Sequence, residues 1–344
     1  MNTITDIFSD MTKVKVLDYC TPEDIPSSVL SSTEPIILKN LVSNWPVVQA
    51  AKSSPEQVCS YLEQYYQGMT TGAGVSSPEN KGRLFYSNDF TQLNFTKEPA
   101  QLDVFLQQVL AAFNDENPVS RYIGSTPVDK LLPNFRATND LAALAQHKPL
   151  VSIWLGNQSR IAAHHDTPNN IACCIAGKRR FTLFPPNQIE NLYLGPLDFN
   201  PAGQAISLVD FHQVDFIKHP KFATALANAQ VAELGPGDSL FLPSMWWHHV
   251  EGLSKLNILV NYWWQTNSAH MGAPMDALLH ALLNIKELPK AQKDAWFDVF
   301  KFYIFNPDET ALSHIPKQRL GVLKPTDDHI ARQIRSMLLN KLNR

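Results

Sequence analysis

His164-His165-Asp166 and, far downstream, Trp246-Trp247-His248-His249 form the most informative pattern in this sequence. In a β-strand successive side chains point to opposite faces, so His164 and Asp166 share one face and His165 points away. Together with His248 from a distant strand, they would place two imidazoles and one carboxylate around a metal ion. This ligand set suits Fe(II) and leaves coordination positions open for a co-substrate and O2. His165 and His249 are then structural or face a substrate.

The composition is that of an ordinary globular protein. The chain has 344 residues, of which 44% are hydrophobic and 18% charged, enough for one large core or two modest ones. A net charge of −3 makes a nucleic-acid partner unexpected, because such proteins usually carry a clearly basic domain. Cys20, Cys59, Cys173 and Cys174 do not form a disulfide framework in a chain of this length, and the adjacent pair indicates core packing.

The sequence predicts a cytoplasmic protein with no membrane association. Residues 1–16 lack the basic region followed by an apolar stretch that is typical of a secretory signal. No run of 18 apolar residues is present either, as a membrane-spanning helix would require. A reducing cytoplasm would also keep Fe(II) available.

Three regions differ in their pattern along the chain. Residues 1–117 mix strands and helices, which we expect to pack on the core. Residues 118–265 consist of short β-rich runs separated by Pro, Gly and Asn, a pattern that indicates a sandwich or barrel. Residues 266–344 are helical. The expected strands are 14–17, 35–38, 83–86, 120–123, 150–155, 161–166, 170–176, 179–184, 238–242 and 257–264, and the expected N-terminal helices are 55–66 and 100–114.

The C-terminal region contains an unusually apolar helix. Apolar spacing predicts helices over about 275–283, 291–305 and 327–342. The segment Trp296–Phe305 is apolar on nearly every side, so either the domain or a second subunit must cover it.

The motifs taken together resemble those of the JmjC, cupin-8-type Fe(II)/2-oxoglutarate-dependent oxygenases. They are the H-x-D triplet, a hairpin ending in Phe184-Pro185-Pro186, the turn Gly235-Pro236-Gly237-Asp238, and Pro243-x-x-Trp-Trp-His. Within this family the chain is similar to the asparaginyl hydroxylase that inhibits hypoxia-inducible factor. The resemblance covers about residues 118–265 and implies a mainly β (α+β) fold. That fold is a double-stranded β-helix, or jelly roll, with flanking helices and a C-terminal helical region that forms a homodimer.

The resemblance also implies roles for individual residues. His164, Asp166 and His248 would be the catalytic ligands of Fe(II). Arg179 would pair with the distal carboxylate of the co-substrate 2-oxoglutarate, which an arginine can bind in a bidentate manner. The remaining matches are Tyr122, which would donate to the same carboxylate, Asn170 and Asn261, which would line the pocket, and Trp263, which would lie near the metal.

One residue departs from the family pattern. Ile161 stands three positions before the first ligand, where many relatives have a threonine or serine hydroxyl. One hydrogen bond to the co-substrate is therefore missing or supplied elsewhere.

Several of these residues also have a structural interpretation when they are taken singly. Arg179 lies between Lys178 and Arg180, as in a solvated basic hairpin, and only strand alternation places it on the inner face with Phe181 and Leu183. Tyr122 by itself would be a core residue. Packing is also the simpler interpretation of Trp154, Trp246 and Trp247.

The favoured hypothesis is a dioxygenase that hydroxylates a side chain of a protein or peptide. Retention of Asp166 favours hydroxylation over halogenation, while demethylation proceeds through the same hydroxylation and stays open. A long groove roofed by residues 70–95, including Tyr86, Asn88 and Asp89, would suit a peptide. A closed pocket would suit the first alternative, a small metabolite or a modified RNA as substrate. The second alternative is a non-catalytic cupin-like regulator that binds a metal or ligand, and Ile161 is the feature in its favour.

Overall fold

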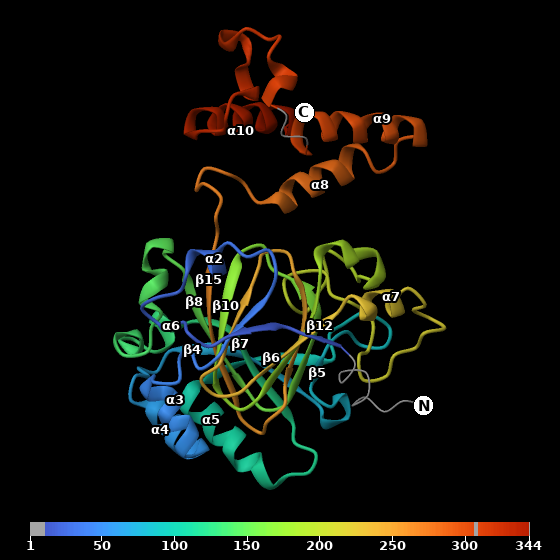
Figure 1. Ribbon diagram of the computed structural model, residues 1–344. Coiled ribbons are helices and arrows are strands. Elements are labelled where there is room, and N and C mark those ends of the chain that lie inside the picture. The colour runs from blue at the N-terminus through green and yellow to red at the C-terminus, as the bar shows by residue number, and fades with distance from the viewer. Residues whose placement is uncertain (1–10, 306–308, 344) are drawn as a thin grey trace. The chain divides into compact units, whose positions relative to one another are not determined.

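Two β-sheets form the first of two structural units in a computed structural model that describes residues 11–305 and 309–343 (Figure 1). This unit ends at Gln265, and the second begins at Thr266. In spatial order the six-stranded sheet contains β1 (Thr12–Lys13), β12 (Gln230–Leu234), β11 (Arg179–Phe184), β14 (Trp247–Gly252), β9 (Ser159–His165) and β5 (Arg83–Leu84). The nine-stranded sheet contains β2 (Lys15–Leu17), β3 (Ile36–Leu38), β13 (Ser239–Leu242), β10 (Asn169–Ala176), β15 (Asn257–Trp264), β8 (Leu150–Gly156), β7 (Ser120–Pro127), β4 (Thr70–Ser76) and β6 (Phe95–Gln101).

The two sheets share a buried apolar layer. On β11, alternation turns Phe181 and Leu183 into this layer, where they join Leu240 of β13 and Leu259 of β15. Burial of such side chains contributes about 1.5–3 kcal/mol each. The facing sheets agree with the jelly-roll arrangement that the sequence predicts, and their inner layer fixes which side chains can reach the site.

Helices and loops cover the outer faces of both sheets. The nine-stranded sheet carries α3 (Pro46–Ser53), α4 (Pro55–Glu63) and α5 (Leu102–Ala111), while α7 (Phe222–Ala227) packs with the segment that covers the six-stranded sheet (Figure 1). The short helices α2 (Ser27–Leu30) and α6 (Val128–Leu131) complete the unit. Ser54 caps α4, because its hydroxyl accepts the Gln57 amide at 3.1 Å, which satisfies a free donor of the first turn.

The elements predicted from the sequence are incomplete, and some of their bounds differ from those in the structure. The strand expected at 83–86 is only Arg83–Leu84, and the helix expected to reach residue 66 ends at Glu63. β4 contains Gly72 and Gly74, and β6 contains Pro99, residue types that strands usually avoid. Pro99 is tolerated because β6 is an edge strand, where one side of the backbone needs no partner. α3 and β12 also form without a clear sequence signal, whereas β14 is the distant strand on which the sequence predicts His248.

The second unit is built from α8 (Pro274–Asn284), α9 (Lys290–Phe300) and α10 (Asp328–Leu342). The predicted helix over 291–305 is correct up to Phe300, after which residues 301–305 form a π turn. Apolar side chains are widely exposed in this unit: Phe297 is 69% exposed, Ile304 67% and Phe305 73%. The apolar segment that the sequence singles out is therefore an uncovered surface of the described chain.

All four cysteines are free and buried. Burial raises the pKa of Cys59, Cys173 and Cys174 to about 12, so these thiols are protonated at neutral pH. Their role is core packing, as the adjacent pair predicts. None of the helices in the described residues is long and apolar enough to cross a membrane.

Candidate functional site

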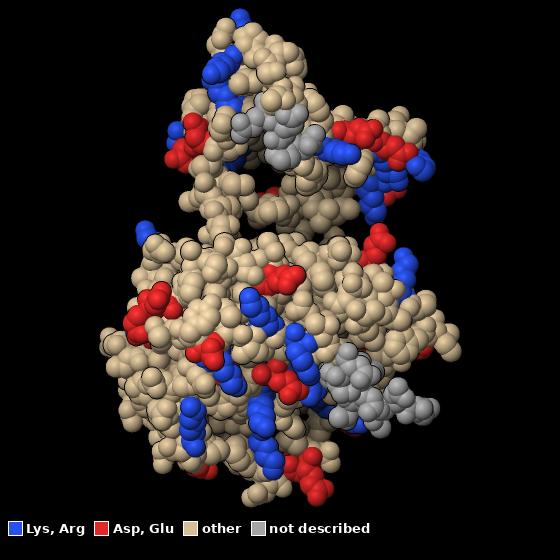
Figure 2. Space-filling model, viewed as in Figure 1, with Lys and Arg blue, Asp and Glu red and all other residues tan. Residues whose placement is uncertain are grey.

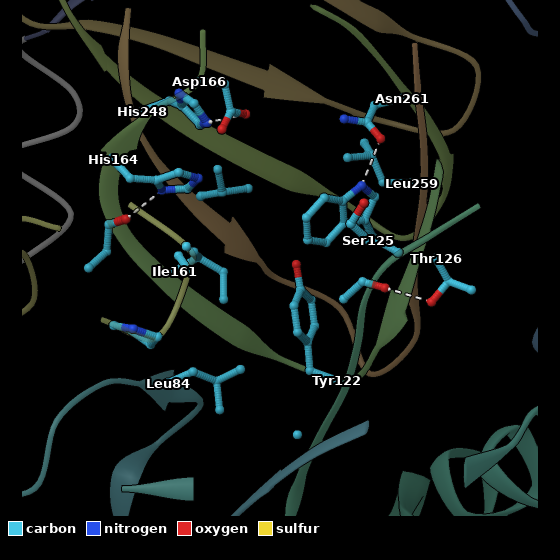
Figure 3. A pocket seen from close by; sticks show the side chains of 18 of the residues that line it. Leu84, Tyr122, Ser125, Thr126, Ile161, His164, Asp166, His248, Leu259 and Asn261 are labelled. Carbon is cyan, nitrogen blue, oxygen red and sulfur yellow. Dashed lines mark hydrogen bonds and ion pairs between the residues drawn. The ribbon is translucent and has the colours of Figure 1, made fainter. Parts of the chain in front are cut away.

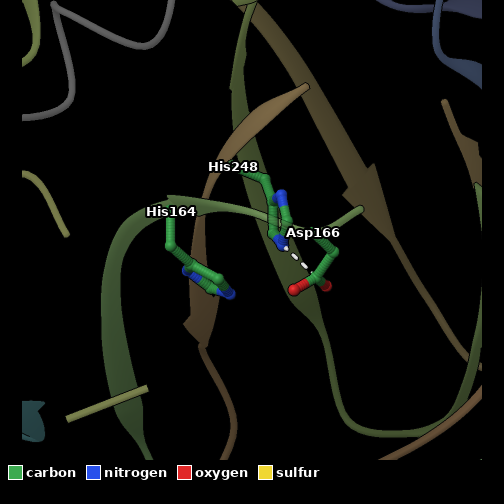
Figure 4. A group of neighbouring side chains, drawn as sticks. All are labelled: His164, Asp166 and His248. Carbon is green, nitrogen blue, oxygen red and sulfur yellow. Dashed lines mark ion pairs between the residues drawn. The ribbon is translucent and has the colours of Figure 1, made fainter. Parts of the chain in front are cut away.

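The side chains of His164, Asp166 and His248 point toward one another (Figure 4). His164 lies on β9 directly opposite His248 on β14, and their ring centroids are 4.3 Å apart. Asp166 follows β9, and its Oδ2 lies 3.7 Å from Nε2 of His248. One ligand atom of each residue lies within 4.8 Å of the others. The structure thus brings together the three residues that the sequence predicts as metal ligands.

Hydrogen bonds orient both imidazoles toward this point. Nδ1 of His164 lies 2.9 Å from the Ala162 carbonyl, and Nδ1 of His248 lies 3.0 Å from the Trp246 carbonyl. Because a carbonyl can only accept, each Nδ1 carries the proton and each Nε2 keeps its lone pair for a ligand. Burial and the neighbouring His164 lower the pKa of His248 to about 4, so its ring is neutral at pH 7. Two imidazoles and a carboxylate fit a divalent metal ion.

The loop that carries Asp166 is tied to the loop before β14. The Met245 amide donates to the Asp166 carbonyl at 2.8 Å, and the Ser244 amide donates to Oδ1 of Asn169 at 2.9 Å. These bonds join the segment that supplies the carboxylate to the one that leads into His248. The ligand from outside the strand is therefore held as firmly as those within it.

A cavity of about 620 Å³ opens beside the triad (Figure 3). Its size is within the range of small-molecule and cofactor sites. All eight residues proposed from the sequence line this one cavity; they are Tyr122, His164, Asp166, Asn170, Arg179, His248, Asn261 and Trp263. They come from six strands and one loop, which explains why no short motif contains them all.

Arg179 is a buried cation with unpaired donors. Its residue is 1% exposed, and both Nε and Nη2 have no hydrogen-bond partner among the described residues. The strand alternation that separates Arg179 from Arg180 is confirmed, because Arg180 pairs outside the cavity with Glu233 at 2.9 Å. Burial raises the pKa of Tyr122, and the neighbouring Arg179 guanidinium partly offsets this shift. A buried charge normally has a partner, so this end of the cavity is built for an anion.

Two more polar atoms of the cavity lack partners. They are Oδ1 of Asn170 and Nε1 of Trp263, both buried and unbonded among the described residues. Such atoms are costly unless a ligand or water satisfies them. The cavity therefore presents donors, which the oxygens of a 2-oxo diacid could accept, and an acceptor, which a water or another donor could satisfy.

Asn261 accepts a hydrogen bond from Trp154, a residue for which the sequence predicts only a packing role. The Trp154 indole donates to Oδ1 of Asn261 at 2.8 Å, and its ring lies 5.8 Å from that of Trp263 and 6.1 Å from that of Tyr122. The bond turns the Asn261 amide nitrogen into the space beside the triad (Figure 3). Trp154 thus positions three predicted site residues. The sequence does contain a signal for this role of Trp154. The residue lies near the centre of β8, and an indole N–H that is buried there needs a hydrogen-bond acceptor.

Trp154→Phe is expected to lower the free energy of unfolding by about 1–3 kcal/mol, because it leaves a buried amide oxygen unpaired. Trp263→Phe is the matched control, since it removes a donor that already has no partner. Urea unfolding of both variants would check this. Equal losses would show that ring packing alone, and not the bond to Asn261, accounts for the effect.

Ile161 reaches the cavity wall through a β-bulge. In a regular strand, residues three apart point to opposite faces, so Ile161 and His164 would be separated. The pairing of β9 with β14 shifts by one residue between His248 and Val250, and such a bulge redirects side chains. Both Ile161 and His164 therefore line the cavity. The departure from the family pattern lies on the wall of the site itself.

His165 and His249 point away from the triad, as strand alternation predicts. The His165 ring packs edge-on against Trp247 at 4.5 Å, and that of His249 stacks on Phe211 at 4.3 Å. Neither lines the cavity.

The expected roof over residues 70–95 is only partly correct. Tyr86 is 3% exposed, and its hydroxyl donates to the Phe199 carbonyl at 2.9 Å. Tyr86, Asn88 and Asp89 are not among the residues that line the cavity. Its rim instead includes residues 71–74 of β4, Phe95 and Lys97 of β6, and the loop 201–203, none of which carries a sequence signal for a site.

Comparison with known proteins shows which family model and which relatives this chain matches. A model of the cupin-like domain matches residues 22–270. The chain is 25% identical over 219 residues to lysine-specific demethylase JMJ31 of Arabidopsis thaliana, covering 63% of this chain and 36% of that protein. It is 38% identical over 123 residues to JmjC domain-containing protein F of Dictyostelium discoideum, covering 32% and 26%. It is 24% identical over 257 residues to Jumonji C domain-containing protein 5 of Drosophila melanogaster, covering 72% and 59%. The chain therefore spans less than two thirds of the length of each of these relatives.

Proposed function

The chain belongs to the family of cupin-like domains, is like a JmjC 2-oxoglutarate oxygenase, and we propose that it hydroxylates a side chain of a protein substrate. The observation that carries this proposal is the convergence of His164, Asp166 and His248 on a cavity that also holds a buried arginine with two unpaired donors. A metal site alone would suit many functions. The anion-binding end, in the same cavity, supports a redox co-substrate with a carboxylate.

The protein residues have separable tasks. The imidazoles of His164 and His248 and the Asp166 carboxylate would hold iron(II), with the carbonyls of Ala162 and Trp246 fixing the imidazole tautomers. Bound together, iron(II), 2-oxoglutarate and O2 would supply the oxidising power that inserts one atom of O2 into a C–H bond, while the other atom leaves in succinate and CO2 is released.

Arg179 and Tyr122 would bind the distal carboxylate of 2-oxoglutarate. The unpaired Nε and Nη2 of Arg179 offer two parallel donors to a carboxylate. Oδ1 of Asn170 and Nε1 of Trp263 would orient the rest of the molecule or the waters beside it. Ile161 contributes only an apolar contact at the position where many relatives place a hydroxyl.

The charges of the cavity support hydroxylation of a neutral or acidic side chain. Arg179 and Lys97 are its cations, and among the described lining residues Asp166, a metal ligand, is the carboxylate. A lysine ammonium entering this space would therefore have no free acidic partner, although one matched relative is named as a lysine-specific demethylase. Charge balance favours hydroxylation over demethylation of a basic residue.

The proposal is tested by following conversion of 2-oxoglutarate to succinate by NMR, with and without added Fe(II). We expect iron-dependent, substrate-independent turnover at a slow rate and faster turnover with a substrate. A complete lack of conversion under all conditions would favour a non-catalytic cupin-like regulator, for which Ile161 on the cavity wall is the supporting observation. Turnover that is accelerated only by a metabolite or an RNA would show that this molecule, and not a protein, is the substrate. The interspersed acidic and basic side chains in Figure 2 show no continuous basic surface on the face in view, which is why RNA is the weaker alternative.

We also propose that the protein is a homodimer joined through its C-terminal helices. Exposed apolar patches of this kind mark interaction sites, and Leu283 is 74% exposed, Phe297 69% and Phe305 73%. A cytoplasmic location is proposed on the grounds that four free, buried thiols suit a reducing compartment.

Leu283→Asp combined with Phe297→Asp is expected to convert a dimer into a monomer, because burial of two carboxylates in an apolar interface is strongly unfavourable. Light scattering would show twice the chain mass for the natural protein and a single chain mass for the variant. The control is Lys293→Asp, which changes an exposed charge on α9, the helix that carries Phe297. This variant should remain dimeric. A monomeric natural protein would contradict the proposal.

A further inference from the structure

Two phenylalanine rings are exposed beside the cavity in a fixed arrangement. Phe90 is 42% exposed and Phe199 is 36% exposed. Both rings pack on the buried Tyr86, with centroid distances of 5.1 Å for Phe90 and 5.6 Å for Phe199. We call these three residues the aromatic shelf. Two exposed rings packed on one buried ring form a small apolar patch, the kind of surface feature at which a partner can bind.

The turn that presents Phe90 is held in an unfavourable backbone conformation. Phe90 has φ of 60°, a region that bulky residues rarely occupy. The Asp89 carboxylate fixes the turn, because Oδ1 accepts from the Ser87 hydroxyl at 2.6 Å and from the Thr91 amide at 3.1 Å. Strain of this kind persists only where the surroundings enforce it. The position of the Phe90 ring is therefore set by the turn before any partner binds.

The aromatic shelf is continuous with the rim of the cavity. The Tyr86 hydroxyl donates to the Phe199 carbonyl at 2.9 Å, and Phe199 precedes the rim loop 201–203 by two residues, at most about 7 Å of chain. Tyr86 also shares a buried cluster with Ala162 and Ile206, both of which line the cavity. A molecule that leaves the cavity over this loop therefore meets the shelf next.

The part of the cavity lining that β4 supplies leaves room for a main chain. Gly72 and Gly74 of β4 line it, and a Cβ added at Gly72 would meet no atom within 4 Å. Lys97 of the neighbouring strand is exposed there and has no ion pair among the described residues. A flat rim with a free cation and a rim with two aromatic rings suit a ligand that extends beyond the cavity. A metabolite confined within the cavity would touch neither Phe90 nor Phe199.

We propose that the aromatic shelf docks an extended segment of a polypeptide substrate, through a bulky apolar side chain a few residues from the side chain that enters the cavity. This deepens the proposed oxygenase function and rests on it. An extended chain advances about 3.3 Å per residue, so residues two to four positions from the modified one lie about 7–13 Å from it and are the candidates for the docking residue. The proposal gives the enzyme a sequence preference on one side of its target.

The test uses pools of 15-residue peptides with a central asparagine, aspartate or lysine. At each position from two to four residues before or after the centre, phenylalanine, leucine or serine is fixed in turn, and the other positions are randomised. Mass spectrometry detects addition of one oxygen atom, and the full chain is assayed with Fe(II) and 2-oxoglutarate. We expect phenylalanine or leucine at one position to lower KM by about tenfold relative to serine, the size of a typical aromatic contact at an interface.

Phe90→Ala and Phe199→Ala should each remove most of this preference, Phe90→Leu should keep much of it, and Ile217→Ala should leave it unchanged. Ile217 is 96% exposed and lies outside the cavity lining, so it is the matched control for loss of a surface apolar group. Thermal unfolding of each variant checks that the fold is intact. An equal preference in Phe90→Ala, Phe199→Ala and the natural protein would overturn the proposal.

Other outcomes separate this proposal from the function on which it rests. Iron-dependent turnover of 2-oxoglutarate without hydroxylation of any peptide pool keeps the oxygenase and overturns the docking site. The absence of all 2-oxoglutarate turnover overturns both. Association of the protein with itself that Phe90→Ala abolishes would assign the shelf to a second copy of the chain, which also overturns it.

Discussion

Asp166→Ala and His164→Ala are each expected to lower iron-dependent turnover of 2-oxoglutarate by well over about a hundredfold. Residues that only support metal ligands change affinity or activity by about 10–100-fold, so loss of a ligand itself should exceed that range. The fold should persist, because neither side chain belongs to the apolar layer between the sheets. Succinate formation gives the activity, equilibrium dialysis with Mn(II) as an iron substitute gives metal affinity, and circular dichroism checks the fold.

His165→Asn is the matched control for these two variants. It lies between the ligands in sequence but packs against Trp247 outside the cavity. We expect it to keep metal binding and most of the turnover. Retention of natural turnover in Asp166→Ala or His164→Ala would remove the metal assignment and, with it, the proposed oxygenase.

Arg179→Met is expected to act in opposite directions on binding and on stability. The natural side chain is buried with two unpaired donors, and replacing an uncompensated buried charge by an apolar group of similar length is neutral or stabilising. The same change removes the partner of the co-substrate carboxylate, a charge-assisted pair whose loss costs about 2–5 kcal/mol, so KM for 2-oxoglutarate should rise by at least about thirtyfold. Steady-state kinetics and thermal unfolding without ligand measure the two effects.

Two control variants separate this explanation from a general loss of structure. Arg179→Lys keeps a charge but not the paired donors, so it should retain part of the affinity. Arg180→Met changes the next residue, which faces the opposite side and contacts the buried Glu251 at 3.7 Å and Glu233 at 2.9 Å. It should lower stability without a selective effect on KM. Loss of stability in Arg179→Met, together with unchanged KM, would show that Arg179 has a structural role only.

Local sequence pattern was sufficient wherever one strand determined the outcome. Period-two alternation separates Arg179 from Arg180 within β11, and it predicts a shared face for His164 and Asp166, although Asp166 lies one residue beyond β9. The apolar runs of β10 and β15 also predict strands correctly, since continuous apolar sequence is typical of strands that are buried on both faces. The serine before Pro55 marks the start of α4 for an equally local reason, the need of the first turn for an acceptor.

Pairing between strands decided the rest of the site. Trp154 and Asn261 are 107 positions apart, and only the register of β8 against β15 makes the indole a partner of the amide. The bulge between β9 and β14 turns Ile161 toward the cavity, against the alternation that the sequence alone implies. Strand pairing also explains β4 and β6. Their glycines and proline have low strand propensity, but β4 pairs with β7 and with β6, and this pairing extends the sheet through both strands.

By itself, then, the sequence determined which side chains could act together on one metal ion, because ligand chemistry and strand periodicity are local properties. The tertiary structure alone decided the shape and reach of the cavity: its glycine-lined rim, the buried and unpaired state of Arg179, and the exposed rings of Phe90 and Phe199. Each of these depends on contacts between segments far apart in the chain, whose register no single stretch of residues encodes.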